Sequence, residues 1–267
     1  MPWHHDGAAV ARPQNVTSGR RYRGVNVLVL WIAAEACGFA NGLWGTYRQW
    51  QAAGAQVRKA ERGTTIVLWK QATSRVDDES HDGDASHGRI FARAFTVFNI
   101  AQVEGYEPAP VAMLPESDLI DHADAFVAAL QIPITVGAYD AHYRIDLDHI
   151  FMPPFAAFCD ATGHLGTLIH ECAHATRAKH RLDRNFAERF NRDSRAIEEA
   201  CAELTDSYIL ADLGIAHHPR PDHAAYVASW LRVLKDDPRA IFTAASKAQQ
   251  AADWMHDRQQ RTEAIAA

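Results

Sequence analysis

The sequence contains no apolar run that reaches the roughly 18–20 residues of a membrane-spanning helix. The first twelve residues also lack the apolar segment of a secretory signal. Cysteine is scarce and scattered, with no close pair of the kind that holds a metal, at Cys37, Cys159, Cys172 and Cys201. These absences predict a cytoplasmic protein with reduced thiols and without a membrane partner.

Internal repeats are absent too, and the composition is that of an ordinary globular protein. The 267 residues are 48% hydrophobic and 22% charged, enough for one large or two small domains. The net charge of −6 conceals an asymmetry. Residues 1–70 hold nine Lys and Arg against three Asp and Glu, a net +6, so the remainder carries −12. This split predicts a first half that binds a polyanion.

The acidic second half contains a His-Glu-x-x-His motif in a segment of helical character, residues 167–176. His170 and His174 lie one helical turn apart, so they project from the same face. Two imidazoles at this spacing bind one Zn²⁺, and Glu171 can take the proton of a water molecule that the zinc activates. Cys172 points away from both imidazoles and is expected to be a packed thiol. The motif predicts a zinc-dependent hydrolase; a surface helix with two unrelated histidines is the plainer alternative.

A catalytic zinc needs a third protein ligand, and the helix expected over residues 194–213 offers candidates. Glu199, Glu203 and Asp206 follow one another at helical spacing and share a face. We expect Glu199 to bind the metal and Glu203 to accept the free N–H of a ligand histidine; the reverse assignment remains open. His180 is a rival ligand, but the gap before it lacks the glycine of three-histidine zinc peptidases. His164 lies off the motif's face and is expected to be structural.

The basic first half is also aromatic, because five of the seven tryptophans lie within residues 1–70. Basic groups that contact phosphates, together with rings on which unstacked bases lie, are typical of single-strand binding surfaces. Trp31 and Trp50 are expected in the core instead. The predicted DNA contacts are Arg20, Arg21, Tyr22, Arg23, Arg58, Lys59, Arg62 and Lys70.

Hydrophobic periodicity and turn residues predict the order of elements. Residues 1–19 are turn-rich and predict a loosely attached arm. Helices are expected over 27–36, 44–53, 118–130, 162–179 and 194–213, with two more between 221 and 255. Strands are expected over 66–71 and 89–100, paired as a hairpin, and over 134–136 and 143–152. Residues 148–152 are a candidate for an edge strand beside the zinc helix, which would align a peptide substrate.

Several blocks of the sequence resemble the ArdC antirestriction family of plasmids and related mobile elements. The similarity extends from about residue 12 to 255 and is carried by residues 20–28, 54–64, 98–99, 102–105, the zinc motif, 181–184, 202–204 and 225–231. Two departures occur: Ala60 stands where a glycine is expected, and residues 177–179 replace a Gly-His element.

The resemblance implies an α+β protein of two domains. The first, residues 1–110, would be a small α+β domain that binds single-stranded DNA. The second, residues 111–267, would be a mostly helical, zincin-like metallopeptidase domain with a small sheet. Such a protein protects incoming mobile-element DNA from host restriction. Two hypotheses follow: a DNA-associated zinc peptidase acting on a protein or peptide, and a non-enzymatic protein that shields single-stranded DNA and uses zinc for stability.

Overall fold

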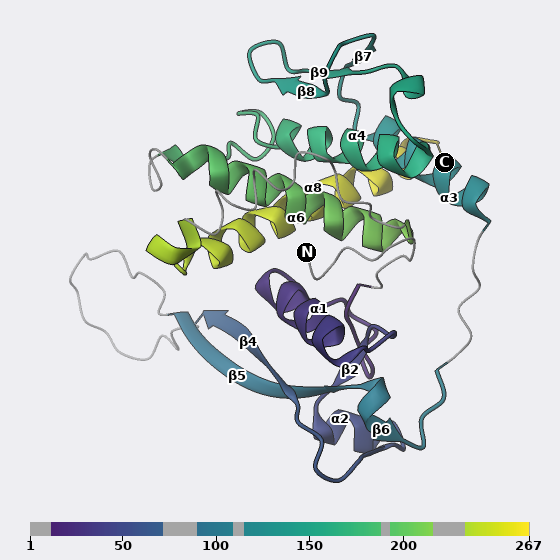
Figure 1. The fold of residues 1–267 in the computed structure, drawn as a ribbon, viewed down its shortest axis with the longest axis vertical. Coiled ribbons are helices and arrows are strands. Elements are labelled where there is room, and N and C mark those ends of the chain that lie inside the picture. Colours follow the sequence, from purple (N-terminus) through teal and green to yellow (C-terminus); the bar gives the residue numbers. More distant parts are fainter. Residues whose placement is uncertain (1–11, 72–89, 109–114, 188–192, 216–232, 267) are drawn as a thin grey trace.

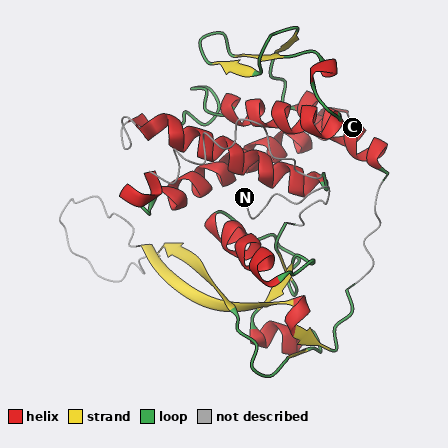
Figure 2. Ribbon diagram, in the orientation of Figure 1, coloured by secondary structure: helices red, strands yellow, loops and turns green. Residues whose placement is uncertain are grey.

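In the computed structural model, strands and helices occupy successive regions of the molecule (Figure 2). The structure describes residues 12–71, 90–108, 115–187, 193–215 and 233–266. A curved hairpin lies at one end, a layer of long helices in the middle and a small sheet at the other end (Figure 1). The predicted α+β class is confirmed. Within the described residues, no helix combines the length and apolarity needed to cross a membrane.

The hairpin consists of β4 (Thr64–Gln71) and β5 (Ile90–Asn99), which pair antiparallel along the whole length of β4. Its β-branched and aromatic residues suit a pleated surface, and the predicted hairpin is confirmed. The sheet continues through β2 (Leu43–Gly45), antiparallel to β5, and β1 (Gln14–Asn15), parallel to β2. A separate two-stranded ladder joins β3 (Gln56–Val57) and β6 (Val103–Glu104).

The helix expected over residues 44–53 begins later, because Trp44 lies in β2. Thr46 starts α2 (Tyr47–Ala52) through a capping box: its hydroxyl accepts the N–H of Gln49, and the Gln49 side chain accepts the N–H of Thr46. Periodicity alone did not reveal this boundary. The earlier helix is close to its prediction, since α1 spans Val25–Cys37 and ends at Gly38 with φ 66°.

The prediction of a loose N-terminal arm is wrong for residues 12–19; residues 1–11 lie outside the described part. The Arg12 guanidinium is buried, donates to Asp212 and Gln249 at 2.7 Å each, and stacks over the Tyr208 ring. Gln14 and Asn15 form β1. The turn-rich composition did not reveal that Arg12 pairs with a buried carboxylate, Asp212, which lies on α6 200 residues later in the chain.

The helical layer contains α3 (Glu116–Ala129), α4 (Ala161–Ala175), α6 (Ser194–Leu213) and α8 (Ala240–Ala266). The three helices predicted over residues 118–213 are confirmed, although α4 ends four residues early. α8 extends well beyond the predicted end at residue 255, while residues 216–232 lie outside the described part. Figure 1 shows α4, α6 and α8 running side by side.

The small sheet has the order β7-β9-β8, from β7 (Ile134–Val136), β9 (His149–Met152) and β8 (His142–Arg144). The single strand expected over 143–152 is therefore two, separated by a turn in which Asp148 has φ 50°. The expectation that residues 148–152 form the edge is wrong, because β9 pairs on both sides. The open edge that contacts α4 belongs to β8.

Helix α1 packs on both halves of the molecule and lies between the hairpin and the long helices (Figure 1). Val27, Leu28 and Trp31 belong to the large core built by α3, α4, α6 and α8, whereas Leu30 packs with Ile66 of the hairpin. Trp31 and Trp50 are buried, as predicted. The domain border at residue 110 stays a prediction.

Candidate metal centre and nucleic-acid groove

The two motif histidines lie on the last turns of α4. Asp160 caps the N-terminus of α4, since its carboxylate accepts the N–H of Gly163 at 2.7 Å. His170 and His174 have their ring centroids 4.7 Å apart and their planes nearly perpendicular. His170 is 3% exposed, so its imidazole lies in the interface between α4 and α6.

Glu199 of α6 lies opposite both imidazoles. Its Oε2 atom is 3.6 Å from Nε2 of His170 and 3.4 Å from Nε2 of His174. One ligand atom from each of the three residues lies within 4.8 Å of the others. Burial by itself raises the pKa of Glu199, but the two imidazoles outweigh it and lower this pKa below its usual range. An ionised carboxylate facing two Nε2 atoms is a ligand set that a divalent metal fits.

The second nitrogen of His170 faces a different pair of carboxylates. Its Nδ1 is 3.6 Å from Glu203 Oε2 and 3.6 Å from Asp206 Oδ2, both buried on α6. These three residues form a second cluster with metal-binding composition. Because Glu203 lies behind His170, away from the shared Nε2 side, its placement suits a carboxylate that orients the ring. The geometry thus favours Glu199 over Glu203 as the third ligand.

Sequence reasoning missed the partner of the other histidine. Nδ1 of His174 is 3.1 Å from Oε1 of Glu198, and Arg184 grips the same carboxylate with contacts of 2.7 and 2.9 Å. Burial opposes ionisation, yet these partners lower the pKa of Glu198 to about 2. Burial likewise lowers the pKa of His174, but Glu198 and Glu199 together raise it to about 10. The adjacent pair Glu198-Glu199 was the only signal in the sequence.

The remaining motif residues occupy clear positions. Glu171 is buried, and its charge helps to raise the pKa of His174, so it lies near the same centre. Cys172 is a buried thiol whose pKa burial raises, in agreement with a packing role. His164 packs edge-on against Phe155 and Phe158. His180 is far more exposed and approaches Asp148 at 3.3 Å instead of the two motif histidines.

A cleft of about 260 Å³ reaches the centre from the His174 side. Glu199 and His174 line it together with three arginines, Arg177, Arg184 and Arg195. His174 and Glu199 therefore border an open cleft, whereas His170 is not among the described residues that line it and lies in the helix interface.

A second, larger groove of about 880 Å³ lies on the N-terminal half, between the 15–26 segment, the start of α2 and the hairpin. Four arginines line it, and no acidic residue is among the described residues that do. Tyr47 is 43% exposed in this groove, and the Arg93 guanidinium lies 4.9 Å from the Phe95 ring centre. Positive charge beside the exposed ring of Tyr47 suits an unpaired nucleic-acid strand. The arginines are Arg21, Arg23, Arg48 and Arg93.

The structure brings together only part of the predicted DNA-binding set. Arg21, Tyr22 and Arg23 line the groove, whereas Arg20, Arg58, Lys59 and Arg62 are exposed outside its lining. Lys70 lies in β4, where its side chain is not described. Arg48 and Arg93 were missed as contacts, Arg93 because its strand lies outside the basic first seventy residues. Pairing with β4 brings it to the groove.

Several of these cations already have acidic partners. Arg21 lies 2.9 Å from Asp212, Arg23 contacts Asp253 with two bonds, and Arg58 contacts Glu61 at 2.6 Å. Because Arg21 and Arg23 are partly neutralised by these partners, we expect Arg48 and Arg93 to supply much of the positive charge that a phosphate in the groove would meet.

Family models match both halves of the chain. Residues 1–98 match the N-terminal domain of anti-restriction factor ArdC, and residues 121–247 match a zincin-like metallopeptidase. A crystal structure of the antirestriction protein ArdC from the R388 plasmid, in metal-free form, superposes with a TM-score of 0.78 at 36% identity. That similarity covers 97% of this chain and 92% of the other. The chain belongs to the ArdC antirestriction family.

The chain is also similar to a second structure and to two further proteins. The Mn(II)-bound structure of the same R388 protein gives a TM-score of 0.73 at 37% identity, covering 92% of this chain and 88% of the other. Uncharacterized protein y4eC of Sinorhizobium fredii (strain NBRC 101917 / NGR234) is 53% identical over 262 residues, 97% of this chain and 85% of that protein. DNA primase TraC of Escherichia coli is 35% identical across 95% of this chain, which spans 25% of TraC. The zincin-like domain implies a metal, and the Mn(II)-bound relative leaves its identity open between zinc and manganese.

Proposed function

We propose that this protein binds single-stranded DNA in the arginine groove and hydrolyses a peptide bond at the centre formed by His170, His174 and Glu199. Together these activities protect incoming mobile-element DNA from host restriction in the cytoplasm. The observation that carries the proposal is the convergence of two Nε2 atoms and one carboxylate oxygen, with the charge of Glu171 nearby. The other half of the chain forms a groove whose described lining residues include four arginines and no acidic residue.

The three ligands would hold Zn²⁺ or a similar divalent ion, whose Lewis acidity lowers the pKa of a water molecule to about 7. A carboxylate oxygen of Glu171 takes the proton of the attacking water and returns it to the leaving amine. Glu198 and Glu203 keep the imidazoles in the tautomer that presents Nε2. The open edge of β8 beside α4 offers backbone groups that can align an extended peptide.

The network around the histidines also supports a second candidate function. His174, which is partly buried, and the buried Glu198 and Arg184 form a chain of bonds that links α4, the segment after it and α6. A metal here would strengthen the same junction, so a DNA-shielding protein with a structural metal fits this network.

Replacing Glu171 with Gln or Ala separates the two functions. The catalytic proposal expects loss of antirestriction during DNA transfer, with metal content and single-strand affinity unchanged. Antirestriction that survives in a metal-loaded, DNA-binding variant would support the shielding function instead. Purified protein without stoichiometric metal would contradict both.

The groove needs its own test in the full-length chain. An isolated N-terminal half is not a suitable test protein. Removing residues 117–267 would expose Val27, Leu28 and Trp31, which belong to the core shared with α6 and α8. Arg48→Gln and Arg93→Gln should instead weaken single-strand binding and reduce its salt dependence. Arg144→Gln serves as the matched control, because Arg144 is exposed, lies outside the groove and is not among the predicted DNA contacts. Equal losses in all three variants would argue against the groove.

A further inference from the structure

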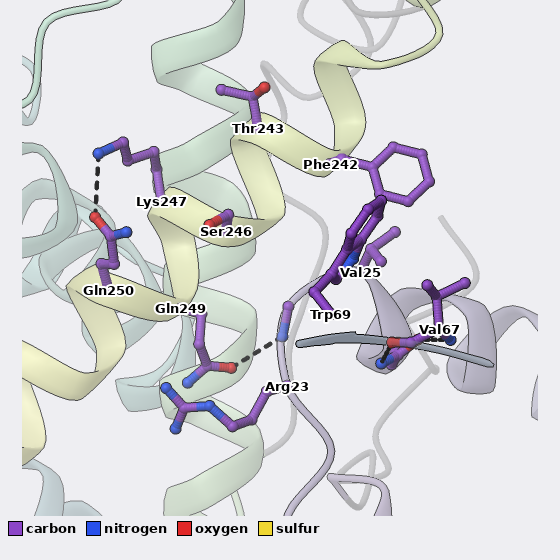
Figure 3. A pocket seen from close by; sticks show the side chains of 12 residues that line it. Arg23, Val25, Val67, Trp69, Phe242, Thr243, Ser246, Lys247, Gln249 and Gln250 are labelled. Carbon is purple, nitrogen blue, oxygen red and sulfur yellow. Dashed lines mark hydrogen bonds between the residues drawn. The ribbon is translucent and has the colours of Figure 1, made fainter. Parts of the chain in front are cut away.

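A third cavity, of about 680 Å³, adjoins the arginine groove and is lined by residues from both halves of the chain. β4 and the 23–26 segment form one wall, and α8 forms the other (Figure 3). We call this cavity the α8 slot. It shares Arg23, Asn26 and Val67 with the lining of the arginine groove, so the two cavities are neighbours on one continuous surface.

The α8 slot contains a pair of exposed rings. Trp69 of β4 is 56% exposed and Phe242 of α8 is 42% exposed. Their centroids are 6.4 Å apart and their planes nearly perpendicular, and Figure 3 shows the two rings side by side. Adjacent exposed apolar groups can form part of an interaction site, and aromatic rings provide the flat surface on which unstacked bases stack.

Polar groups surround the rings without supplying negative charge. Lys247 of α8 donates to Gln250 at 3.1 Å, and Arg23 lies at the border with the groove. Among the described residues that line the slot, none is acidic. This lining disfavours a basic peptide and suits a chain of phosphates and bases.

We propose that a single-stranded DNA segment leaving the arginine groove continues into the α8 slot, where a base stacks on Trp69 and Phe242 and Lys247 contacts a phosphate. This inference rests on the proposed DNA binding of the groove and extends it to the metallopeptidase half. The DNA would then contact both walls at once, close to α6, which packs on α8 and carries Glu199.

The experiment measures the affinity of the full-length protein for oligothymidylates of increasing length, from about 4 to about 16 nucleotides. Short strands fill the groove alone, whereas long strands reach the slot. Phe242→Ala removes a stacking ring and Lys247→Gln removes a phosphate contact, so each should weaken the binding of long strands about tenfold and leave the binding of short strands unchanged. The matched controls are Phe155→Ala and Lys235→Gln, an exposed ring and an exposed lysine outside both cavities.

A 2-aminopurine probe placed stepwise along the long strand gives a second readout. Stacking on the rings should quench its emission at one position in the wild type, and Trp69→Ala or Phe242→Ala should restore it. If long and short strands bind equally and the variants change neither, the slot proposal is wrong while groove binding stands. If no length of strand binds the wild type, the proposed groove function fails with it.

Discussion

Arg184 holds the carboxylate of Glu198 with two bonds, of 2.7 and 2.9 Å, and that carboxylate is in turn 3.1 Å from Nδ1 of His174. All three side chains lie in the interface between α4 and α6 or beside it. Metal ligands depend on such partners, because a bond at one ring nitrogen determines where the other points. The pair therefore acts on the proposed metal through His174 without touching it.

Loss of this pair should weaken metal binding. Glu198→Gln and Arg184→Leu are expected to lower the affinity for Zn²⁺ or Mn²⁺ by about 10–100-fold, the usual effect of losing an outer partner of a ligand histidine. Competition with a chromogenic chelator measures it. Arg181→Gln is the control, because Arg181 pairs with Asp148 and not with a carboxylate of the α6 cluster. Unchanged affinity in Glu198→Gln would refute the positioning role.

Metal affinity should also depend on pH. The pKa of His174 in the metal-free chain is raised to about 10, so its imidazole is protonated at pH 7 and must lose that proton to bind a metal. Apparent affinity should rise about tenfold per pH unit between pH 6 and 8. Glu199 has a lowered pKa, remains ionised there and adds no pH dependence. A flat profile over this window would contradict the assignment of His174.

The same raised pKa has a consequence for the stability of the metal-free protein. The ionic contacts of His174 stabilise the fold fully below its unfolded pKa near 6.5, and this contribution is lost as the pH rises through about 10. Denaturant unfolding at pH 7 and pH 10 should show a decrease for the wild type. The decrease should be smaller in Glu198→Gln, where one of the partners that raise this pKa is neutral.

Arg12 should matter for folding despite its place near the N-terminus. Its side chain is 4% exposed and that of Asp212 is 1% exposed, so Arg12→Ala leaves a buried carboxylate with fewer partners. Arg21 and His256 still contact Asp212, which places the expected loss of unfolding free energy at or below the roughly 3–5 kcal/mol of a broken buried pair. Arg20→Ala, an exposed neighbour, should change stability by less than about 0.5 kcal/mol. Equal melting temperatures for the two variants would contradict a stabilising role of Arg12 and would support a loosely attached N-terminal arm.

Ala60 occupies a backbone conformation that favours glycine, with φ 68°. The glycine expected there from the family pattern fits this conformation without strain. Ala60→Gly should therefore raise stability by about 1 kcal/mol, since left-handed backbone costs a non-glycine residue about 1–2 kcal/mol. Ala101→Gly, at an exposed position without positive φ, should instead be neutral or destabilising. Thermal unfolding of the two variants decides between these outcomes.

The metal motif and the hairpin could be predicted because each depends on local periodicity. His170 and His174 share a face in any helix, and the residue patterns of 66–71 and 89–100 favour paired strands. Glu199 could be predicted as a candidate ligand because Glu199, Glu203 and Asp206 follow one another at helical spacing in the next helix. Its identity as the nearest carboxylate to both Nε2 atoms required the packing of α6 against α4.

Other features depend on contacts between distant residues. Arg93 joins the groove only because β5 pairs with β4, and Glu198 orients His174 only because Arg184 returns to the same interface. β9 lies inside its sheet because β7 pairs beside it, which no local pattern reveals.

What the sequence determined by itself is the chemistry that is available: two imidazoles one turn apart, a basic and aromatic first half, and an acidic second half. What only the tertiary structure decided is which of those groups meet. Arg12 pairs with a carboxylate 200 residues away, and Arg21 and Arg23 form ion pairs with Asp212 of α6 and Asp253 of α8. Trp69 of the first half contacts Phe242 of the second half. The physical reason is that sequence periodicity reports only which residues share a face of one helix or strand. The contacts between the two halves arise because α1 is buried between two cores, which brings residues far apart in the sequence together.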